Sequence, residues 1–295
     1  MIERTFQHIP GVGPWGEKDL WARGIFTWAD FPAAGGGVGI SPRKDAAARE
    51  KIQEARDALE RRDLGHLARM FPQREHWRLY PKFTEHAAYF DIETDGNDTH
   101  APTVVSVFDA DGLQVFIKGR NLDALPELLA RRTLWVTFNG SCYDAPMLQK
   151  YFGLTFPQPL LHFDLRFFFR RLGFRGGLKR LEDTLGFARP LHLRGANGMD
   201  AVLLWRAYQR TGDIEALRFL VEYNLYDAFQ LRSLADHGYN LATGKLAFDD
   251  EPQLSVFDRG EVLYDVSKLL LELSPTDTDQ RVLARVRAME ALSFP

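Results

Sequence analysis

The chain has 295 residues, of which 45% are hydrophobic and 26% charged, as in ordinary globular proteins. A formal net charge of -3 argues against a generally cationic nucleic-acid coat protein, although it allows a local basic surface. The single cysteine, Cys142, excludes a disulfide framework and a zinc site built on several cysteines. Apolar runs of transmembrane length and a signal-peptide core are both absent from the sequence. We therefore expect a soluble, cytoplasmic protein with no membrane partner.

Residues 1–80 are predicted to form a helical region. The turn Pro10-Gly11-Val12-Gly13 lies near its start, and Gly11 and Gly13 would permit a close backbone approach to a phosphate. This stretch resembles a helix-hairpin-helix element, which implies nucleic-acid binding at the two glycines. Pro14 departs from the usual pattern because it removes one amide donor. The alternative is a plain turn between two packed helices.

A longer helix is predicted further along this region. A periodic stretch rich in Ala, Glu and Arg runs from Pro42 to Leu67, and Ser41-Pro42 suits a helix start. The run Ala33 to Gly39 before it predicts a flexible connection.

Residues 81–243 are predicted to form an α/β domain. Short β-type runs occupy residues 87–94, 103–110, 113–119 and 134–140. Ala110-Asp111-Gly112 between the second and third runs predicts an antiparallel hairpin. Helical patterns cover residues 121–132, 145–152, 198–211 and 213–236. This order predicts a mixed sheet flanked by helices. Residues 244–295 form an acidic C-terminal extension with one helix expected near 279–292, and we interpret it as a packing or partner-contact segment.

The first candidate for chemistry is the strand that contains Asp91 and Glu93. Alternate residues of a strand share a face, so these two carboxylates point one way while Phe90 and Ile92 point the other. Burial and mutual repulsion disfavour the charged forms, and a divalent cation would relieve both penalties. The alternative is a chance Asp-x-Glu pair.

Two further segments each have an ordinary structural explanation when taken alone. Asp144 follows the turn Asn139-Gly140 and precedes Pro146, so it could simply cap a helix. Tyr223 and Asp227 are four residues apart and share one helical face, as in any amphipathic helix.

The three segments together resemble the DEDD superfamily of 3′–5′ exonucleases, which have a ribonuclease-H-like fold. The chain looks most like the proofreading domains of family B DNA polymerases and the YprB-like proteins. The third motif has the tyrosine form, because Glu222 stands where the histidine form requires His. The resemblance covers roughly residues 86–236.

This resemblance implies two-metal phosphodiester hydrolysis with two Mg²⁺ or Mn²⁺ ions, which prefer hard oxygen ligands. Asp91 would bridge both ions, and Glu93 and Asp227 would hold the ion that generates the nucleophile. Asp144 would support the other ion through water. Tyr223 would orient the attacking water, because a phenol with a pKa near 10 is better suited to positioning than to proton abstraction.

A basic stretch suggests the path of the substrate. Residues 165–194 carry eight bases and two acids, with four phenylalanines interleaved: Arg166, Arg170, Arg171, Arg175, Lys179, Arg180, Arg189 and Arg194 against Glu182 and Asp183, with Phe167, Phe168, Phe169 and Phe174. Cations can follow phosphates while rings stack on bases of a single strand. We take Asn139, Arg175, Lys179 and Arg180 as candidate nucleic-acid contacts. The alternative is a buried phenylalanine cluster with solvated arginines.

The resulting hypothesis is a metal-dependent 3′–5′ exonuclease acting on single-stranded DNA ends. Two alternatives remain open, namely an RNase with the same site acting on short or structured RNA, and a non-catalytic nucleic-acid-binding module. DNA is favoured over RNA as the partner, although these motifs contain nothing that detects a 2′-hydroxyl. Protein partners are not indicated.

Overall fold

A computed structural model of the chain describes residues 1–32, 42–97, 101–187, 189–246, 248, 250–257 and 265–272. The chain divides into two compact units: Met1–Thr84 with Tyr239–Leu254, and Glu85–Gly238 with Ser255–Pro295. The connection predicted over residues 33–39 and the helix predicted near 279–292 lie outside the described residues. Every helix among the described residues is too short or too polar to span a membrane.

The first unit is helical, as predicted. Its α-helices are α1 (Pro14–Ala22), α2 (Pro42–Glu60) and α3 (Leu64–Met70), and short 3₁₀ turns lie at Ile2–Arg4, Trp28–Asp30, Gln73–Arg78 and Tyr80–Lys82. A further 3₁₀ turn, Thr84–His86, lies at the boundary with the second unit. The buried Glu17 carboxylate joins these pieces, because it accepts hydrogen bonds from the Phe6 amide (2.9 Å), the Gln7 side chain (3.0 Å) and Arg78 (3.3 Å).

The single helix predicted from Pro42 to Leu67 is wrong, because the structure breaks it after Glu60. Arg62 adopts the left-handed conformation with φ of 55°, which ends α2. Asp63 then caps α3 by accepting a hydrogen bond from the His66 amide at 2.8 Å. The apolar periodicity continues across the break and therefore concealed it.

The predicted mixed sheet with flanking helices is confirmed in the second unit. Its strands are β1 (Ala87–Thr94), β2 (Pro102–Asp109), β3 (Gly112–Ile117), β4 (Leu134–Thr137) and β5 (Leu161–Asp164), in the spatial order β3-β2-β1-β4-β5. The pairs β1–β2 and β2–β3 are antiparallel, whereas β1–β4 and β4–β5 are parallel. The predicted hairpin is also present, since Asp109 pairs with Gly112 across the turn. Strand β5 was not predicted from the sequence.

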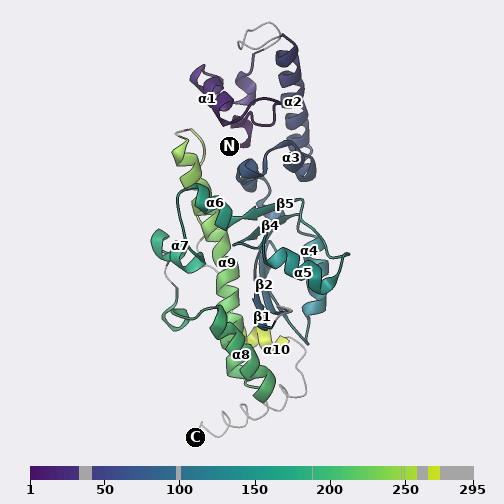
Figure 1. Cartoon of the computed structure of the whole chain (residues 1–295), viewed down its shortest axis with the longest axis vertical. Helices are drawn as coiled ribbons and strands as arrows, with labels where there is room; N and C mark the ends of the chain where they lie inside the picture. Colours follow the sequence, from purple (N-terminus) through teal and green to yellow (C-terminus); the bar gives the residue numbers. More distant parts are fainter. Residues whose placement is uncertain are drawn as a thin grey trace. The chain divides into compact units, whose positions relative to one another are not determined.

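Helices cover both faces of this sheet (Figure 1). The helices of this unit are α4 (Leu125–Ala130), preceded by a 3₁₀ turn at Leu122–Ala124, α5 (Asp144–Phe152), α6 (Leu165–Arg171), α7 (Leu178–Leu185), a 3₁₀ turn at Leu191–Leu193, α8 (Gly198–Thr211), α9 (Ile214–Lys245) and α10 (Val266–Glu272). Most of α9 belongs to this unit, and its last turns belong to the first.

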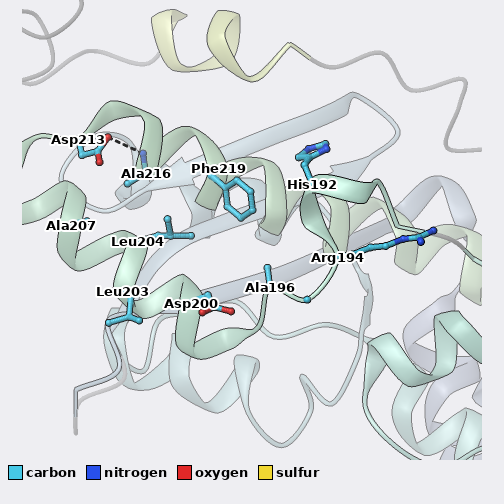
Figure 2. A pocket seen from close by; sticks show the side chains of 11 residues that line it. His192, Arg194, Ala196, Asp200, Leu203, Leu204, Ala207, Asp213, Ala216 and Phe219 are labelled. Carbon is cyan, nitrogen blue, oxygen red and sulfur yellow. Dashed lines mark hydrogen bonds between the residues drawn. The ribbon is translucent and has the colours of Figure 1, made fainter.

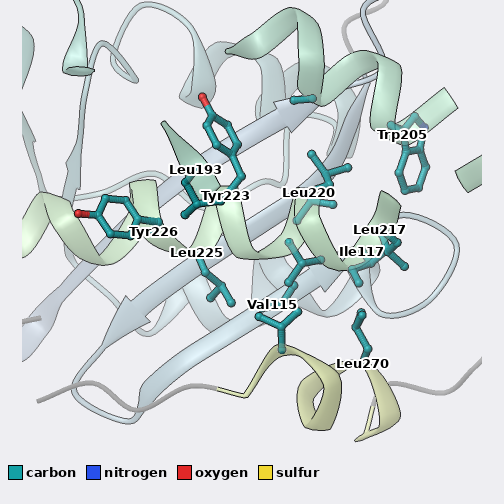
Figure 3. Close-up of a cluster of buried hydrophobic side chains, with 14 of the residues drawn as sticks. Val115, Ile117, Leu193, Trp205, Leu217, Leu220, Tyr223, Leu225, Tyr226 and Leu270 are labelled. Atoms are coloured by element: carbon teal, nitrogen blue, oxygen red, sulfur yellow. The ribbon is translucent and has the colours of Figure 1, made fainter. Parts of the chain in front are cut away.

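The alternation along β1 decides which residues each face receives. Phe90 and Ile92 join a buried cluster with side chains of α4 and α5. The opposite face packs against α9, whose Leu220, Tyr223 and Tyr226 lie in a second cluster with β3 residues (Figure 3). Asp91 and Glu93 therefore face α9, because they alternate with Phe90 and Ile92.

Candidate active site

Three acidic side chains from two elements converge on the α9 face of the sheet. Asp91 and Glu93 come from β1 and Asp227 comes from α9, and one ligand atom from each lies within 4.8 Å of the others. Glu93 and Asp227 are 7% and 5% exposed, respectively. Oxygen donors at this spacing fit Mg²⁺ or Mn²⁺. The structure thus brings together three of the four predicted metal ligands.

Keeping these buried carboxylates ionised costs free energy when no cation is bound. Burial and the charges of Asp227, Glu93 and Asp144 raise the pKa of Asp91 well above its ordinary value. Burial and the charges of Asp227 and Asp144 raise the pKa of Glu93 in the same way. These shifts express the repulsion among like charges that a bound divalent cation would offset.

The fourth predicted ligand, Asp144, is not among the three carboxylates that share the 4.8 Å group. It is the first residue of α5, and the helix cap is Tyr143, so the capping alternative does not hold. Burial and the neighbouring Asp164 charge raise the pKa of Asp144 to about 7. Its charge nevertheless acts on both Asp91 and Glu93, which places Asp144 at the margin of the site.

Asp164, which like β5 was not predicted from the sequence, organises the turn that leads to Asp144. Its carboxylate accepts hydrogen bonds from the Asn139 amide (2.9 Å), the Ser141 amide (3.0 Å) and the Ser141 hydroxyl (2.6 Å). Asn139 has φ of 71°, a conformation that Asn tolerates better than most residues. The predicted nucleic-acid contact at Asn139 therefore also has a structural role in the turn.

Asn224 on α9 is a second residue that sequence reasoning missed. It is fully buried, and its Nδ2 donates a hydrogen bond to Asp91 Oδ2 at 3.0 Å. Asn224 and Asp227 are three residues apart on one helical face, so the spacing could have indicated this contact. The bond fixes the orientation of the Asp91 carboxylate.

Tyr223 is 5% exposed and lies on α9 one turn before Asp227. Burial and the charges of Asp227, Glu93 and Asp91 raise the pKa of Tyr223 above its ordinary value. Its hydroxyl therefore stays protonated. The Lys179 ammonium lies 5.0 Å from the centroid of the Tyr223 ring.

Arg189 is a buried member of the basic stretch 165–194 and is not part of an exposed basic surface. It is 8% exposed, and its guanidinium contacts both Glu182 carboxylate oxygens, at 2.6 and 3.0 Å. Although burial works in the opposite direction, the charges of Asp227 and Glu182 raise the pKa of Arg189. Arg189 thus acts as a structural cation between two buried acids.

The phenylalanines of the basic stretch divide between core and surface. Phe168 and Phe169 are each 2% exposed and lie in an aromatic cluster with Phe163 and Phe174. Stacking of Phe168 or Phe169 on bases is therefore excluded. Phe167 is 37% exposed, and Arg175 and Arg180 also lie on the surface.

The hairpin in the first unit is a turn followed by α1. Gly11 has φ of 82°, Gly13 is the N-cap of α1, and Pro14 is the first helical residue. The described residues before the turn contain the short 3₁₀ helix Ile2–Arg4. A backbone approach to the turn is open, because a Cβ added at Gly11 or Gly13 would meet no atom within 4 Å.

The chain was compared with known protein families, curated proteins and solved structures. The model of the RNase_H superfamily matches residues 88–239, more than half of the chain. The comparisons with curated proteins and with solved structures gave no match. The matched segment spans the mixed sheet and the greater part of α9, including Asp91, Glu93 and Asp227. Together with the strand order and the acidic cluster, this match shows that the chain belongs to the RNase_H superfamily.

Proposed function

We propose that the protein is a metal-dependent 3′–5′ exonuclease of the DEDD type, in its tyrosine form, which acts on single-stranded DNA ends. The observation that supports this most is the convergence of Asp91, Glu93 and Asp227, with Tyr223 one helical turn away. Membership of the RNase_H superfamily supports a nucleic-acid-related hydrolytic activity.

The proposed role of each residue follows from its position in the site. Asp91, Glu93 and Asp227 would hold the divalent ions, and Asp144 would assist from the margin of the site. Divalent ions bound there would activate a water and neutralise charge on the phosphate. Asn224 holds the Asp91 carboxylate through its 3.0 Å hydrogen bond. Such supporting contacts typically change metal affinity or activity by about 10–100-fold.

Tyr223 would position the attacking water rather than remove its proton. The raised pKa keeps the phenol protonated at neutral pH, so its hydroxyl has one hydrogen to donate and an oxygen that can accept. A hydrogen bond from Tyr223 also stabilises the charged form of Asp227. Because that single hydrogen is directed to Asp227, the Tyr223 oxygen would accept a hydrogen bond from the reacting water.

End-labelled oligonucleotides test this proposal directly. Single-stranded DNA labelled at its 5′ end should be shortened stepwise from the 3′ end in Mg²⁺ or Mn²⁺, with release of mononucleotides and no reaction in EDTA. Asp91→Asn and Asp227→Asn should abolish the reaction. Glu215→Gln is the matched control, because Glu215 is an exposed acid in the first turn of the same helix α9.

The alternative functions give different products in the same assay. Faster shortening of RNA than of DNA would identify an RNase. Binding without mononucleotide release under every metal condition would identify a non-catalytic module and contradict the proposal. Hydrolysis that persists in purified Asp91→Asn protein would place the chemistry elsewhere.

A further inference from the structure

A cavity of about 390 Å³ lies beside the acidic cluster in the second unit. It is lined by Lys179, Asp183, Gly186, Phe187, Arg189, Arg194 and Gly195. Three of these residues are cations and one is an acid. Lys179 and Arg189 connect the cavity with the active site, since both lie close to the Tyr223 ring, at 5.0 and 5.8 Å from its centroid.

The three cations retain hydrogen-bond donors that the protein does not use. Lys179 is half-buried, and no described residue forms a hydrogen bond or ion pair with its ammonium, which contacts the Tyr223 ring. The Nη1 atom of Arg189 is buried and has no partner among the described residues. Burying a charged donor without a partner is costly, so this arrangement favours an anionic ligand.

Arg194 is the exposed member of the three. Its Nε donates to the Arg189 carbonyl at 3.1 Å, which fixes the start of the guanidinium. Neither terminal nitrogen of Arg194 has a partner among the described residues. Arg194 also borders a larger cavity of about 540 Å³, but its side chain extends away from Leu203 and Leu204 there (Figure 2). The guanidinium is therefore free to meet a ligand at the smaller cavity.

We propose that this cavity binds a phosphodiester of the substrate strand adjacent to the one being hydrolysed, with Lys179 and Arg194 as its main contacts. The proposal rests on the proposed function, because a strand whose 3′ end lies at the carboxylates must place its next phosphates nearby. A guanidinium and an ammonium are the usual partners of phosphate oxygens. Arg189 contributes charge from the wall of the cavity while it remains paired with Glu182.

Oligonucleotides with one methylphosphonate each can locate this phosphate, because the methylphosphonate is uncharged. Binding is measured by fluorescence anisotropy in EDTA, where no hydrolysis occurs. We expect one position near the 3′ end at which neutralisation weakens binding by wild type about tenfold or more, in the range for a hydrogen bond to a charged group. In Arg194→Ala and Lys179→Gln, the same neutralisation should cost much less.

Arg210→Ala is the matched control, because Arg210 is an exposed arginine on α8 outside the cavity lining. It should change affinity less than twofold and keep the wild-type methylphosphonate profile. Circular-dichroism melting checks that each variant is folded. Identical profiles in wild type and Arg194→Ala would overturn the proposal.

A melting assay with inorganic phosphate and an independent hydrolysis assay distinguish the cavity proposal from a free-phosphate site and from failure of the exonuclease proposal. A rise in melting temperature with inorganic phosphate in wild type but not in Arg194→Ala, together with a flat methylphosphonate profile, would identify a free-phosphate site and overturn the proposal. Hydrolysis is scored independently with unmodified DNA. If wild type hydrolyses DNA and Asp91→Asn does not, a flat methylphosphonate profile removes only the cavity assignment. A position-dependent profile without hydrolysis would instead contradict the exonuclease.

Discussion

The guanidinium of Arg189 lies 2.5 Å from the carboxylate of Asp227, measured from Nη2 to Oδ1. Both side chains are only 7% exposed, so Arg189 offsets part of the cost of burying the charge of Asp227 even without a metal ion. Glu182, which is 1% exposed, contacts the same guanidinium. In this buried group of three residues, the Arg189 guanidinium pairs with both Glu182 and Asp227.

Replacing Arg189 by Gln should destabilise the protein strongly, because it leaves two buried carboxylates without their cation. We expect the free energy of unfolding in EDTA to fall by about 3–5 kcal/mol. Urea unfolding measures this change. Adding Asp227→Asn to Arg189→Gln should recover part of the loss, since one uncompensated charge is removed. A loss below about 1 kcal/mol would show that the pair is much weaker than its burial suggests.

Tyr223→Phe should lower hydrolysis by roughly 10²–10⁴-fold, as expected when one general-catalysis contact is lost. The apolar ring remains in its buried cluster, so the melting temperature should change little. Initial rates with a saturating oligonucleotide, together with a Mn²⁺ titration, distinguish lower turnover from weaker metal binding. Tyr226→Phe is the control, because Tyr226 lies in the same buried cluster and is not proposed to act. Unchanged turnover in Tyr223→Phe would assign that residue a structural role.

Gly140→Ala should displace Asp144. A Cβ at Gly140 would overlap the Thr137 hydroxyl and would lie 2.5 Å from Asp144 Oδ2. We expect at least a tenfold loss of hydrolysis, in the range for disturbed supporting contacts of a metal site. Gly198→Ala is the control, because its added Cβ would meet no atom within 4 Å. Wild-type rates in folded Gly140→Ala protein would show that hydrolysis does not depend on the position of Asp144.

The stability of the metal-free protein should fall as pH rises from about 6.5 to 8. Asp91 and Glu93 have raised pKa values, and that of Asp144 is about 7. The folded state therefore binds more protons than the unfolded chain, whose carboxyl groups titrate near pH 4. Each such group lowers the free energy of unfolding by up to about 1.4 kcal/mol per pH unit.

A comparison with and without metal isolates the contribution of the acidic cluster, because Glu182, whose pKa burial raises to about 7, also titrates in this pH range. Burial lowers the pKa of His8 and His162 to about 4, and both groups stabilise the folded state increasingly with pH up to about 6.5. Melting temperatures are therefore compared above that pH, in EDTA and in Mn²⁺. The decline in EDTA should be reduced or reversed in Mn²⁺, whose binding requires ionised carboxylates. Parallel curves would contradict metal binding at these acids.

The hairpin should matter for long substrates and not for dinucleotides, if it binds a phosphate. Gly11→Val with Gly13→Val should weaken binding of long oligonucleotides at low salt, because phosphate contacts depend on ionic strength. A second site adds affinity only when one substrate reaches both. Gly24→Val is the control for backbone strain, since Gly24 has φ of 81° and Gly11 has φ of 82°. Unchanged binding across a salt series would leave the hairpin as a plain turn.

The sequence alone determined the elements whose residues carry a local signal. Strict alternation along β1 placed Asp91 and Glu93 on one face, and the turn residues identified the β2–β3 hairpin. It did not identify β5, because the segment Leu161–Asp164 contains no β-branched residue, whereas the equally short β4 contains Val136 and Thr137. Asp164 at the end of β5 was missed for the same reason. The break between α2 and α3 was also hidden, because one left-handed residue leaves the apolar pattern intact.

Only the tertiary structure decided the roles of the charged residues around the site. In the sequence Arg189 is one of many bases, and its pairing with Glu182 and Asp227 depends on how the segment after α7 packs against α9. Lys179 keeps unused donors beside a cavity for the same reason. Sequence spacing reports which residues share a strand or helix face. Burial and long-range pairing arise when the elements pack, and they determine which charges are compensated within the protein and which are left for a ligand.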